Sequence, residues 1–345
     1  MTTENLKLQE FGELGLITLN RPRALNALSL DMIIDMRLQL EKWSKTPHIK
    51  GVAICSSDPR AFCAGGDIRA VWEIAQSDPD RAATYFKEEY VLDRMIYHFP
   101  KPCLALVDGI WMGGGVGVAI HTKCTIVTEN AVFAMPEAAI GFIPDVGTSR
   151  ILAKLPANIG KLLAMTGLRL NAGDALGLKL AQNYVPHKAI PEVIDWLKQG
   201  VNWRQPLHTQ IKHRWCEFPP ELSQFDGSLK RKIRNLFQAD NAPEIAIALE
   251  KSHWEQAQYW RKLMARNSPQ AMALAVEAQK RAKSYSFDEA IAMESAIAEQ
   301  LIHQQSDMIE GIRALIIDKD KNPQWSPPSL ESIDLNKIHH FFDPV

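Results

Sequence analysis

The residue types best suited to chemistry in this sequence are two groups of glycines and two acids that follow them. The glycines are Gly65-Gly66 and Gly113-Gly114-Gly115, and each group stands after an apolar run and before a segment of helical character. The acids are Glu137, directly after Met-Pro, and Asp145, directly after Ile-Pro. Backbone N–H groups at a helix start can polarise a carbonyl, and acids in apolar surroundings can move protons. The pattern therefore indicates carbonyl chemistry.

The two glycine groups have the composition of an oxyanion hole. Two tight backbone turns, one at each group, can direct two N–H donors at one oxygen atom. A glycine pair taken alone is more often a tight turn without a chemical role, and that interpretation stays open for either group. A dinucleotide-binding motif is excluded because Ile120 occupies the third glycine position after Gly115 and Gly117, and the sequence has no P-loop motif.

Glu137 and Asp145 are the candidates for proton transfer. A carboxyl group among apolar residues is desolvated, and a second acid nearby raises the pKa of one of the two. Such a group can exchange protons near neutral pH. A helix cap or a salt bridge is the more common role of an isolated acid. The position of the pair after the glycine groups favours an active site.

Three arginines, Arg21, Arg23 and Arg69, lie near the early turns and are candidates for binding a phosphate group. A solvated surface charge is the more common role of any one arginine. Pro22 ends the strand pattern beside them, because it lacks an N–H donor and restrains the residue before it.

The elements that must position these residues alternate between strands and helices. Residues 6–11 and 15–19 predict two strands joined at Gly12-Glu13, and Ser29 predicts the N-cap of a helix that runs to about residue 44. Further strands are expected at residues 51–56, 104–107, 124–128 and 131–135. A mostly helical stretch with a break near residues 77–79 is expected over residues 70–98. This strand–strand–helix order predicts an α/β core.

The sequence beyond about residue 200 predicts helices. Residues 244–266 carry apolar residues at helical spacing, Ser268 precedes Pro269 as an N-cap, and Ser286 with Glu289 forms a capping box. Ser306 predicts the start of a helix over residues 307–317. We therefore expect two regions: an α/β catalytic core over residues 1–200 and a mainly helical C-terminal region over residues 201–345.

The composition excludes several classes of protein. The 345 residues carry a formal net charge of −1, which gives no reason to expect a nucleic acid as partner. No apolar run approaches the roughly 18 residues of a membrane span, and the N-terminal residues lack the features of a signal peptide, so we expect a cytoplasmic protein without a membrane partner. We expect buried thiols, with neither disulfides nor a metal site, because no metal-binding spacing occurs among the histidines or among Cys55, Cys63, Cys103, Cys124 and Cys216.

The motifs around the candidate residues resemble those of the enoyl-CoA hydratase/isomerase (crotonase) superfamily. The matching pieces span about residues 10–150: Ile17 to Pro22 with Asn26-Ala27-Leu28, Phe62 to Asp67, Lys101 to Gly115, and Pro136 to Gly147. Within the superfamily the sequence is most similar to the 3-hydroxyisobutyryl-CoA hydrolases. The features that carry this likeness are residues 65–69, 86–90, 112–117, 135–137 and 144–147, and a tail with residues 317–320 and Asn322-Pro323-x-Trp325. The resemblance implies a crotonase-like spiral of strand–strand–helix repeats with a helical C-terminal region.

The resemblance also implies a role for each candidate residue. The N–H groups of Gly66 and Gly114 would form the oxyanion hole for the thioester oxygen. Glu137 would be the principal catalytic acid, and Asp145 and Glu89 would close on the acyl group and its hydroxyl. The CoA moiety would border the backbone near three residues: Arg23, Ala24 and Ala64. An acyl-CoA would be the substrate, with no cofactor beyond the CoA that it carries, and a homo-oligomer is one possible assembly.

Position 117 separates the reactions open to such a site. A hydratase of this superfamily uses two glutamates, one at the position of Gly117, so hydration lacks an acid here. An isomerase needs one carboxylate, and Glu137 would suffice. A hydrolase must position or replace a water molecule, for which Asp145 provides a second acid.

We therefore expect hydrolysis of 3-hydroxyisobutyryl-CoA, or of a similar short 3-hydroxyacyl-CoA, in valine catabolism. The alternatives are an enoyl-CoA isomerase or hydratase of fatty-acid oxidation and a non-catalytic CoA-binding protein. One departure from the hydrolase pattern is Thr148-Ser149, where glycine usually follows, and it is expected to affect the acyl pocket.

Overall fold

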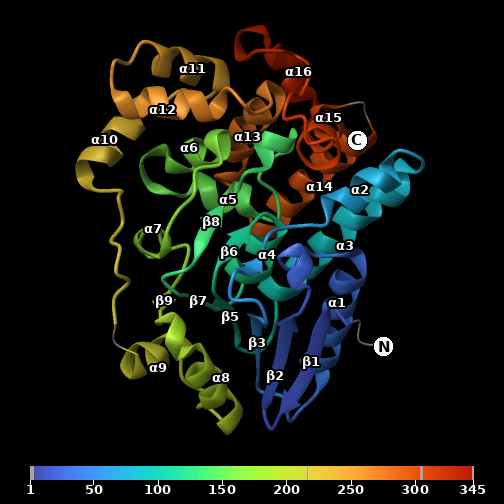
Figure 1. Cartoon of the computed structure of the whole chain (residues 1–345), viewed down its shortest axis with the longest axis vertical. Helices are drawn as coiled ribbons and strands as arrows, with labels where there is room; N and C mark the ends of the chain where they lie inside the picture. The colour runs from blue at the N-terminus through green and yellow to red at the C-terminus, as the bar shows by residue number, and fades with distance from the viewer. Residues whose placement is uncertain (1–3, 216, 304–305, 344–345) are drawn as a thin grey trace. The chain divides into compact units, whose positions relative to one another are not determined.

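The computed structural model describes residues 4–215, 217–303 and 306–343, and the chain divides into two compact units (Figure 1). The first unit comprises Met1–Asp67, Glu88–Phe133 and Leu170–Phe225. The second comprises Ile68–Lys87, Ala134–Arg169 and Asp226–Val345. Each unit therefore gathers three separate segments. The expected boundary near residue 200 divides the chain into two continuous regions, whereas these units are discontinuous in sequence. The expected boundary therefore stays a prediction.

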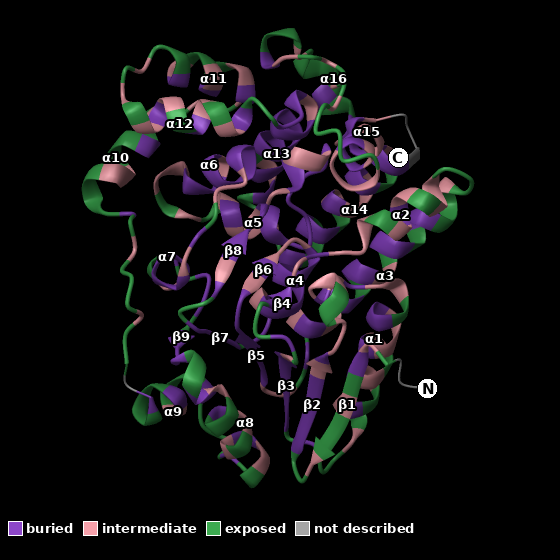
Figure 2. Ribbon diagram, viewed as in Figure 1, coloured by how far each residue is buried: buried purple, intermediate pink, exposed green. Residues whose placement is uncertain are grey.

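A six-stranded sheet organises the first unit, in the order β1-β2-β3-β5-β7-β9. The bounds are β1 (Leu6–Phe11), β2 (Leu14–Leu19), β3 (Gly51–Ser56), β5 (Cys103–Val107), β7 (Cys124–Val127) and β9 (Asn183–Tyr184). β1 and β2 form the expected antiparallel hairpin, and every later strand is parallel to its neighbour. The edge strand β1 carries exposed residues, whereas β5 and β7 are buried throughout, as parallel strands covered on both faces are (Figure 2).

A second, three-stranded sheet is formed by short strands that follow β3, β5 and β7 in the chain. Its strands are β4 (Ala61–Cys63), β6 (Ile110–Met112) and β8 (Val132–Ala134), in that order. The pairs β3–β4, β5–β6 and β7–β8 thus each send one strand to the large sheet and one to the small sheet. This arrangement confirms the predicted α/β class. Three short strands, β4, β6 and the two-residue β9 of the large sheet, were not predicted from the sequence.

Helices of the first unit cover the large sheet on both faces. They are η1 (Pro22–Ala24), α1 (Leu30–Lys45), α4 (Gly114–Ile120), α7 (Ala172–Gly177), η4 (His187–Ala189), α8 (Ile190–Gln199) and α9 (Leu207–Arg214). On one face, α8 and α9 bury residues such as Leu197 and Ile211 in a core with Leu16 of β2. On the other face, the indole of Trp43 from α1 lies against Gly15, where a Cβ would approach the ring to 2.7 Å.

Helices also build the second unit, in agreement with the expected helical C-terminal region. They are α2 (Ile68–Ala75), η2 (Glu137–Ile140), α5 (Thr148–Ala153), η3 (Pro156–Asn158), α6 (Ile159–Thr166), α10 (Gly227–Leu236), α11 (Ala242–Glu250), α12 (Glu255–Met264), α13 (Pro269–Ala282), α14 (Phe287–His303), α15 (Asp307–Ile312), η5 (Arg313–Ile317), η6 (Leu330–Ser332) and α16 (Leu335–His340). The chain passes from the second unit to the first within α3 (Pro79–Tyr97). α13, buried along most of its length, packs against α5 and α6.

Side-chain caps start several helices where the sequence predicts them. Ser29 Oγ accepts the N–H of Met32 at 3.3 Å, and Ser268 Oγ accepts that of Ala271 at 2.9 Å. Ser286 and Glu289 form the reciprocal capping box, with distances of 2.7 and 3.2 Å. These local hydrogen bonds satisfy first-turn donors that the helix itself leaves unpaired.

Two helical stretches differ from the expectation. The stretch over residues 244–266 is two helices, because Ser252 Oγ accepts the N–H of Trp254 at 3.3 Å and this local bond competes with the helix ladder. The helix expected over residues 307–317 ends as an α-helix at Ile312 and continues as a π-helix.

Arg313 holds the C-terminal tail of the second unit. Its guanidinium donates to Asp318 at 2.6 Å, to Asp320 at 2.7 Å and to both oxygens of Glu310 at 2.8 Å. The acids of the tail motif at residues 317–320 therefore serve as partners of one arginine.

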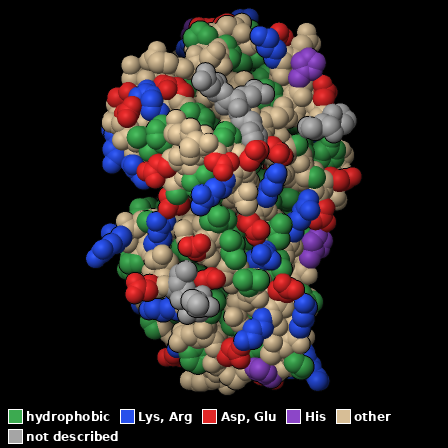
Figure 3. Space-filling model, turned by 90° about the vertical axis from the view of Figure 1, so that its right-hand side faces the viewer, with side chains coloured by type: hydrophobic (Ala, Val, Ile, Leu, Met, Phe, Trp, Pro, Cys, Tyr) green, Lys and Arg blue, Asp and Glu red, His purple; other side chains and the backbone are tan. Residues whose placement is uncertain are grey.

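Basic and acidic side chains are interspersed on the face of the molecule drawn in Figure 3, in keeping with the net charge near zero. Among the residues that the structure describes, no helix is long and apolar enough to cross a lipid bilayer.

Candidate active site

The two glycine groups lie against each other in the first unit. A Cβ placed on Gly114 would lie 3.5 Å from the backbone nitrogen of Gly66, and a Cβ on Gly65 would lie 3.8 Å from that of Gly114. Gly65 has a φ of +114°, which a residue with a side chain adopts only with strain. The structure thus brings together the two backbones that the sequence singled out as donors to one oxygen.

Leu28 sets the direction of the Gly66 backbone. The N–H of Leu28 donates to the carbonyl of Gly65, its own carbonyl accepts the N–H of Asp67, and both distances are 2.8 Å. Because these ladder bonds go to the residues on either side of Gly66, the N–H of Gly66 is directed away from Leu28. Gly114 is the first residue of α4, so its N–H is one of the first-turn donors that point beyond the helix end. Their role as oxyanion donors to one oxygen stays a prediction.

Glu89, in the part of α3 that belongs to the first unit, reaches the same place. A Cβ on Gly114 would come within 2.0 Å of Oε1 of Glu89, so a side chain at position 114 would have to displace this carboxylate. Glu89 is buried, with 3% of its surface exposed. The structure therefore places a buried carboxylate next to the glycine pair, and its role toward an acyl group stays a prediction.

Asn26 holds the turn beneath this site, and the sequence analysis gave it no role. Its side-chain amide donates to Ser56 Oγ at 2.7 Å and to the Ala61 carbonyl at 3.1 Å, and its side-chain oxygen accepts the N–H of Arg21 at 2.8 Å. Arg21 in turn pairs with Asp67 at 2.7 Å. Arg21 is thus part of the scaffold that leads to Gly66. The sequence does contain a signal for this role, because Asn26 belongs to the Asn26-Ala27-Leu28 motif, which follows the end of β2.

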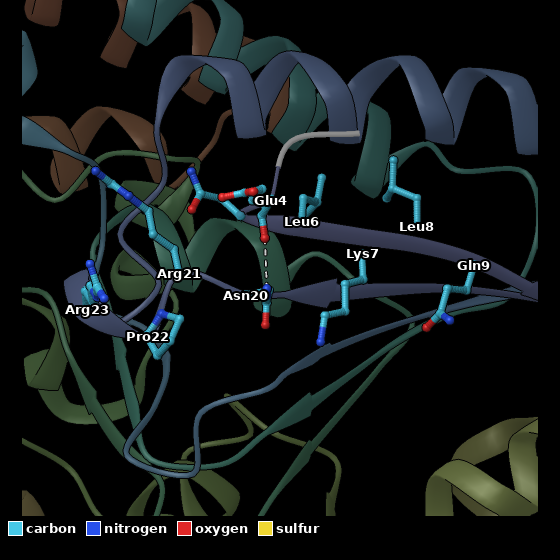
Figure 4. A pocket seen from close by; sticks show the side chains of 10 residues that line it. Glu4, Leu6, Lys7, Leu8, Gln9, Asn20, Arg21, Pro22 and Arg23 are labelled. Carbon is cyan, nitrogen blue, oxygen red and sulfur yellow. Dashed lines mark hydrogen bonds between the residues drawn. The ribbon is translucent and has the colours of Figure 1, made fainter. Parts of the chain in front are cut away.

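A groove of about 880 Å³ borders the start of the first unit (Figure 4). β1 lines it with residues that include Lys7, and the segment after β2 lines it with Arg21, Pro22 and Arg23. The N–H of Ala64 donates to the Leu25 carbonyl at 3.0 Å, which places Ala64 beside the turn that contains Ala24. The cationic side chains of Lys7, Arg21 and Arg23 could bind an anionic group in this groove. Arg69 lies in the second unit instead, where it bonds to the carbonyl of Ile316.

The second unit contains Glu137 and Asp145. Glu137 follows β8 and opens η2, where its backbone carbonyl accepts the N–H of Phe142 at 3.0 Å. Both acids are buried, with 6% of Glu137 and 4% of Asp145 exposed, and Met135 and Phe142 beside them are buried too. Both acids are therefore buried, and their catalytic roles stay predictions.

A third buried acid, Glu294 of α14, lies near Asp145 and was missed by the sequence analysis. Burial raises the pKa of Glu294 to about 8, against its ordinary value of 4.5, and the charge of Asp145 adds to this increase. Hydrogen bonds from the side chain of Ser149 and from the backbones of Gly147 and Ser149 oppose it. A signal for Glu294 does exist in the sequence, because it stands at helical spacing among the apolar residues Ile291 and Ile297.

The hydroxyls of Thr148 and Ser149 bond within their own loop. Thr148 Oγ1 donates to the carbonyl of Asp145 at 2.7 Å, and Ser149 Oγ donates to that of Pro144 at 3.2 Å. Thr148 and Ser149, which stand where glycine usually follows, therefore contribute hydrogen bonds within this loop. Their effect on an acyl pocket stays a prediction.

Four cysteines, Cys55, Cys63, Cys103 and Cys124, are buried free thiols as expected, and Cys216 lies outside the described residues. Burial raises the pKa of Cys63, Cys103 and Cys124 to about 12, so these thiols are unreactive. Over residues 4–215, 217–303 and 306–343, no group of three or more His, Cys, Asp or Glu side chains is placed to hold a metal ion.

Comparison with known proteins places the whole chain in one family. The model of the enoyl-CoA hydratase/isomerase family matches residues 14–342. The chain belongs to the enoyl-CoA hydratase/isomerase family. It is 35% identical over 344 residues to the mitochondrial 3-hydroxyisobutyryl-CoA hydrolase of Gallus gallus, which covers 98% of this chain and 88% of the relative. It is 33% identical over 342 residues to the protein of the same name from Homo sapiens, with 98% and 88% covered.

Solved structures of this family share the fold over nearly the full chain. An enoyl-CoA hydratase from Rhodobacter sphaeroides superposes with a TM-score of 0.89 at 33% identity, covering 99% of this chain and 98% of that one. A carnitinyl-CoA dehydratase from Mycobacterium thermoresistibile superposes with a TM-score of 0.91 at 31% identity, covering 99% and 97%. These similarities confirm the crotonase-like fold that the motifs predict.

Proposed function

We propose that this protein hydrolyses the thioester of 3-hydroxyisobutyryl-CoA, or of a similar short 3-hydroxyacyl-CoA, to the free acid and CoA in valine catabolism. The observation that carries the proposal is the distribution of acids. Gly117, at the position where a hydratase of the family has its second glutamate, is buried in α4 and has no side chain. Asp145 supplies a second buried acid elsewhere in the sequence.

The names of the relatives support this choice within the family. The curated relatives at 33–35% identity from Gallus gallus and Homo sapiens are named 3-hydroxyisobutyryl-CoA hydrolases. The two solved relatives at 31–33% identity are named as a hydratase and a dehydratase. Identity of this size does not separate hydrolysis from hydration, so the proposal also relies on the distribution of the acids.

In the proposed reaction the N–H groups of Gly66 and Gly114 hold the thioester oxygen. When the carbonyl carbon becomes tetrahedral, this oxygen gains negative charge, and two fixed backbone donors stabilise the charge without reorganising. The loss of one such donor costs about 100- to 1,000-fold in rate in other enzymes that use an oxyanion hole.

Glu137 acts on the carbonyl carbon in one of two ways. Its carboxylate either attacks directly and forms a mixed anhydride that water then cleaves, or it takes a proton from the attacking water. Asp145 and Glu89 serve as acceptors for the acyl hydroxyl or for the water. Each acid is buried, and the exclusion of bulk water strengthens such interactions.

The groove between β1 and the segment after β2 is proposed to border the CoA moiety. Lys7 and Arg23 line this groove and suit the phosphate groups of CoA, and the turn with Ala24 lies beside Ala64. CoA enters as part of the substrate, so the proposal includes no separate cofactor.

The cytoplasm as the site of action and a homo-oligomeric assembly are also part of the proposal. The relatives are named as mitochondrial proteins, which makes the location a point to test by fractionation of the cells that produce this protein. Sedimentation of the purified protein would give the number of chains.

The proposed function is tested by following free CoA with a thiol reagent during incubation with 3-hydroxyisobutyryl-CoA. Wild type is expected to release CoA continuously, and Glu137→Gln is expected to release it at the spontaneous rate. No release by wild type above the spontaneous rate, together with hydration of crotonyl-CoA, would favour a hydratase and overturn the proposal.

A further inference from the structure

Glu294 is an acid at the centre of an apolar helix face. It lies in the middle of α14 with no exposed surface, and Ile291, Ile297 and Leu301 of the same helix are buried around it. A buried carboxyl group lowers stability unless hydrogen bonds compensate for its lost hydration. Its presence among these residues therefore calls for specific partners in the second unit.

The partners of Glu294 are backbone N–H groups at the start of α5. Oε2 accepts the N–H of Gly147 at 2.5 Å, and Oε1 accepts the N–H of Ser149 at 3.0 Å. Gly147 is the N-cap of α5, so these donors belong to the helix end that has no partners inside the helix. The two oxygens of one carboxyl group thus hold the two ends of a three-residue segment.

The segment that Glu294 holds leads directly from Asp145 and is strained. Val146 has a φ of +51° and Gly147 a φ of +79°. A β-branched residue such as Val146 adopts a left-handed conformation only with backbone strain. Such a conformation persists when surrounding contacts impose it, and Glu294 supplies two of those contacts.

Hydrogen bonds inside the loop connect the held segment to Asp145. The N–H and the hydroxyl of Thr148 donate to the carbonyl of Asp145, at 2.9 and 2.7 Å. Thr148 lies between Gly147 and Ser149, the two residues that Glu294 holds. The backbone of Asp145 is therefore fixed through Thr148 to a segment that is fixed by Glu294.

An electrostatic link accompanies these contacts. The charge of Asp145 contributes to the raised pKa of Glu294, so the two carboxyl groups are close enough to influence each other. A change at Glu294 thus reaches Asp145 through the backbone and through the local field.

We propose that Glu294 is a positioning residue that holds the Pro144–Ser149 loop and so orients the carboxyl group of Asp145 for thioester hydrolysis. The proposal rests on the proposed function, because it assigns Asp145 a part in that reaction. Glu294 itself acts through the amides of Gly147 and Ser149 and has no contact with substrate in this role.

The test uses the full-length Glu294→Gln variant, which keeps the size of the side chain. Its amide retains one acceptor oxygen but places an NH₂ group against the second backbone N–H, so one of the two bonds is lost. We expect kcat for 3-hydroxyisobutyryl-CoA to fall roughly 10- to 100-fold while KM changes little, because misplaced groups impair the chemical step more than binding.

Hydrogen exchange supplies a readout that does not depend on activity. The amides of Gly147 and Ser149 are expected to exchange faster in Glu294→Gln than in wild type. The control is Ile297→Val, which removes one methyl group from a fully buried neighbour on the same helix and leaves both amide bonds in place. It is expected to lower Tm while keeping wild-type kcat and wild-type exchange at both amides.

The outcomes separate the two hypotheses. Wild-type kcat in Glu294→Gln, unchanged exchange, or an equal loss of kcat in Ile297→Val would each overturn the positioning role. If wild type hydrolyses no thioester, the proposed function is wrong. In that case hydrogen exchange still tests the loop, because unchanged exchange in Glu294→Gln would show that Glu294 does not hold the amides of Gly147 and Ser149. If Glu294→Gln does not fold, Glu294→Asp takes its place, and its shorter side chain is expected to reach one amide and to give an intermediate kcat.

Discussion

Glu89 and a side chain at position 114 cannot occupy the same space. A Cβ on Gly114 would lie 2.0 Å from Oε1 of Glu89 and 3.2 Å from its Cδ. The glycine at position 114 therefore does more than allow a turn. It leaves room for a buried carboxylate beside the backbone nitrogen of Gly66, which would lie 3.5 Å from the same Cβ.

Gly114→Ala is expected to lower kcat for thioester hydrolysis by about 100-fold or more, because the new methyl group must displace either Glu89 or the helix start that carries the oxyanion donor. Steady-state kinetics with 3-hydroxyisobutyryl-CoA measures this. The matched control is Gly227→Ala at the first position of α10, where a Cβ would meet nothing within 4 Å. It is expected to leave kcat and Tm near wild type. Normal activity in Gly114→Ala would show that hydrolysis does not require the close approach of Glu89 to position 114.

Asp145→Asn distinguishes hydrolysis from isomerisation. A hydrolase that uses the second acid is expected to lose about 100-fold or more in kcat, because the amide cannot take a proton from water or from the acyl hydroxyl. An isomerase that depends on Glu137 alone would keep most of its activity. Both rates are measured on the same preparation, with 3-hydroxyisobutyryl-CoA and with an enoyl-CoA, and retention of hydrolysis in the variant would remove Asp145 from the mechanism.

Lys7→Gln and Arg23→Gln are expected to raise KM for the CoA thioester several-fold, because each removes a cation from the groove proposed for CoA. The same variants should leave KM unchanged for the N-acetylcysteamine thioester of the same acid, which has no phosphate groups. Lys45→Gln, at an exposed position on α1, serves as the control for a lost surface charge. Equal changes in KM for both thioesters would place the CoA phosphates elsewhere.

The raised pKa of Glu294 predicts the pH dependence of stability. Its pKa is about 8 in the folded protein, against an ordinary value of 4.5 that applies to the unfolded chain. The folded state therefore binds more protons between these values, and stability falls as pH rises from about 4.5 to about 8. The free energy of unfolding of wild type relative to Glu294→Gln is expected to decrease across this range, by at most about 1.4 kcal/mol per pH unit. Urea denaturation at several pH values checks this. A difference that stays constant or increases with pH would contradict it.

Short sequence motifs correctly predicted the structural elements that depend on residues close together in the chain. The hairpin at residues 6–19, the Ser29 and Ser268 caps and the Ser286 capping box all appear where short motifs indicate them. Glu294 could not be assigned to the site in this way. Its partner amides at Gly147 and Ser149 lie about 145 residues away in the chain, and only the packing of α14 beside α5 brings them together.

The division into two units could not be predicted from the sequence, because it also depends on contacts between residues far apart in the chain. Each unit combines three segments, so no single shift in composition marks its limits. The arginines show the effect on a smaller scale. Their positions near the early turns made Arg21, Arg23 and Arg69 equal candidates for a phosphate. In the folded chain Arg21 and Arg23 both line the groove, but Arg21 also pairs with Asp67, and Arg69 donates to a backbone carbonyl of the second unit.

The most direct test of thioester hydrolysis is a single incubation of wild type with 3-hydroxyisobutyryl-CoA in water enriched in ¹⁸O, followed by mass spectrometry of the products. Hydrolysis predicts free CoA and a free acid with one heavy oxygen in its carboxylate. A hydratase working in reverse and forward would instead keep the CoA thioester and place the heavy oxygen in its hydroxyl group. Recovery of the labelled thioester without free acid would contradict the proposed function.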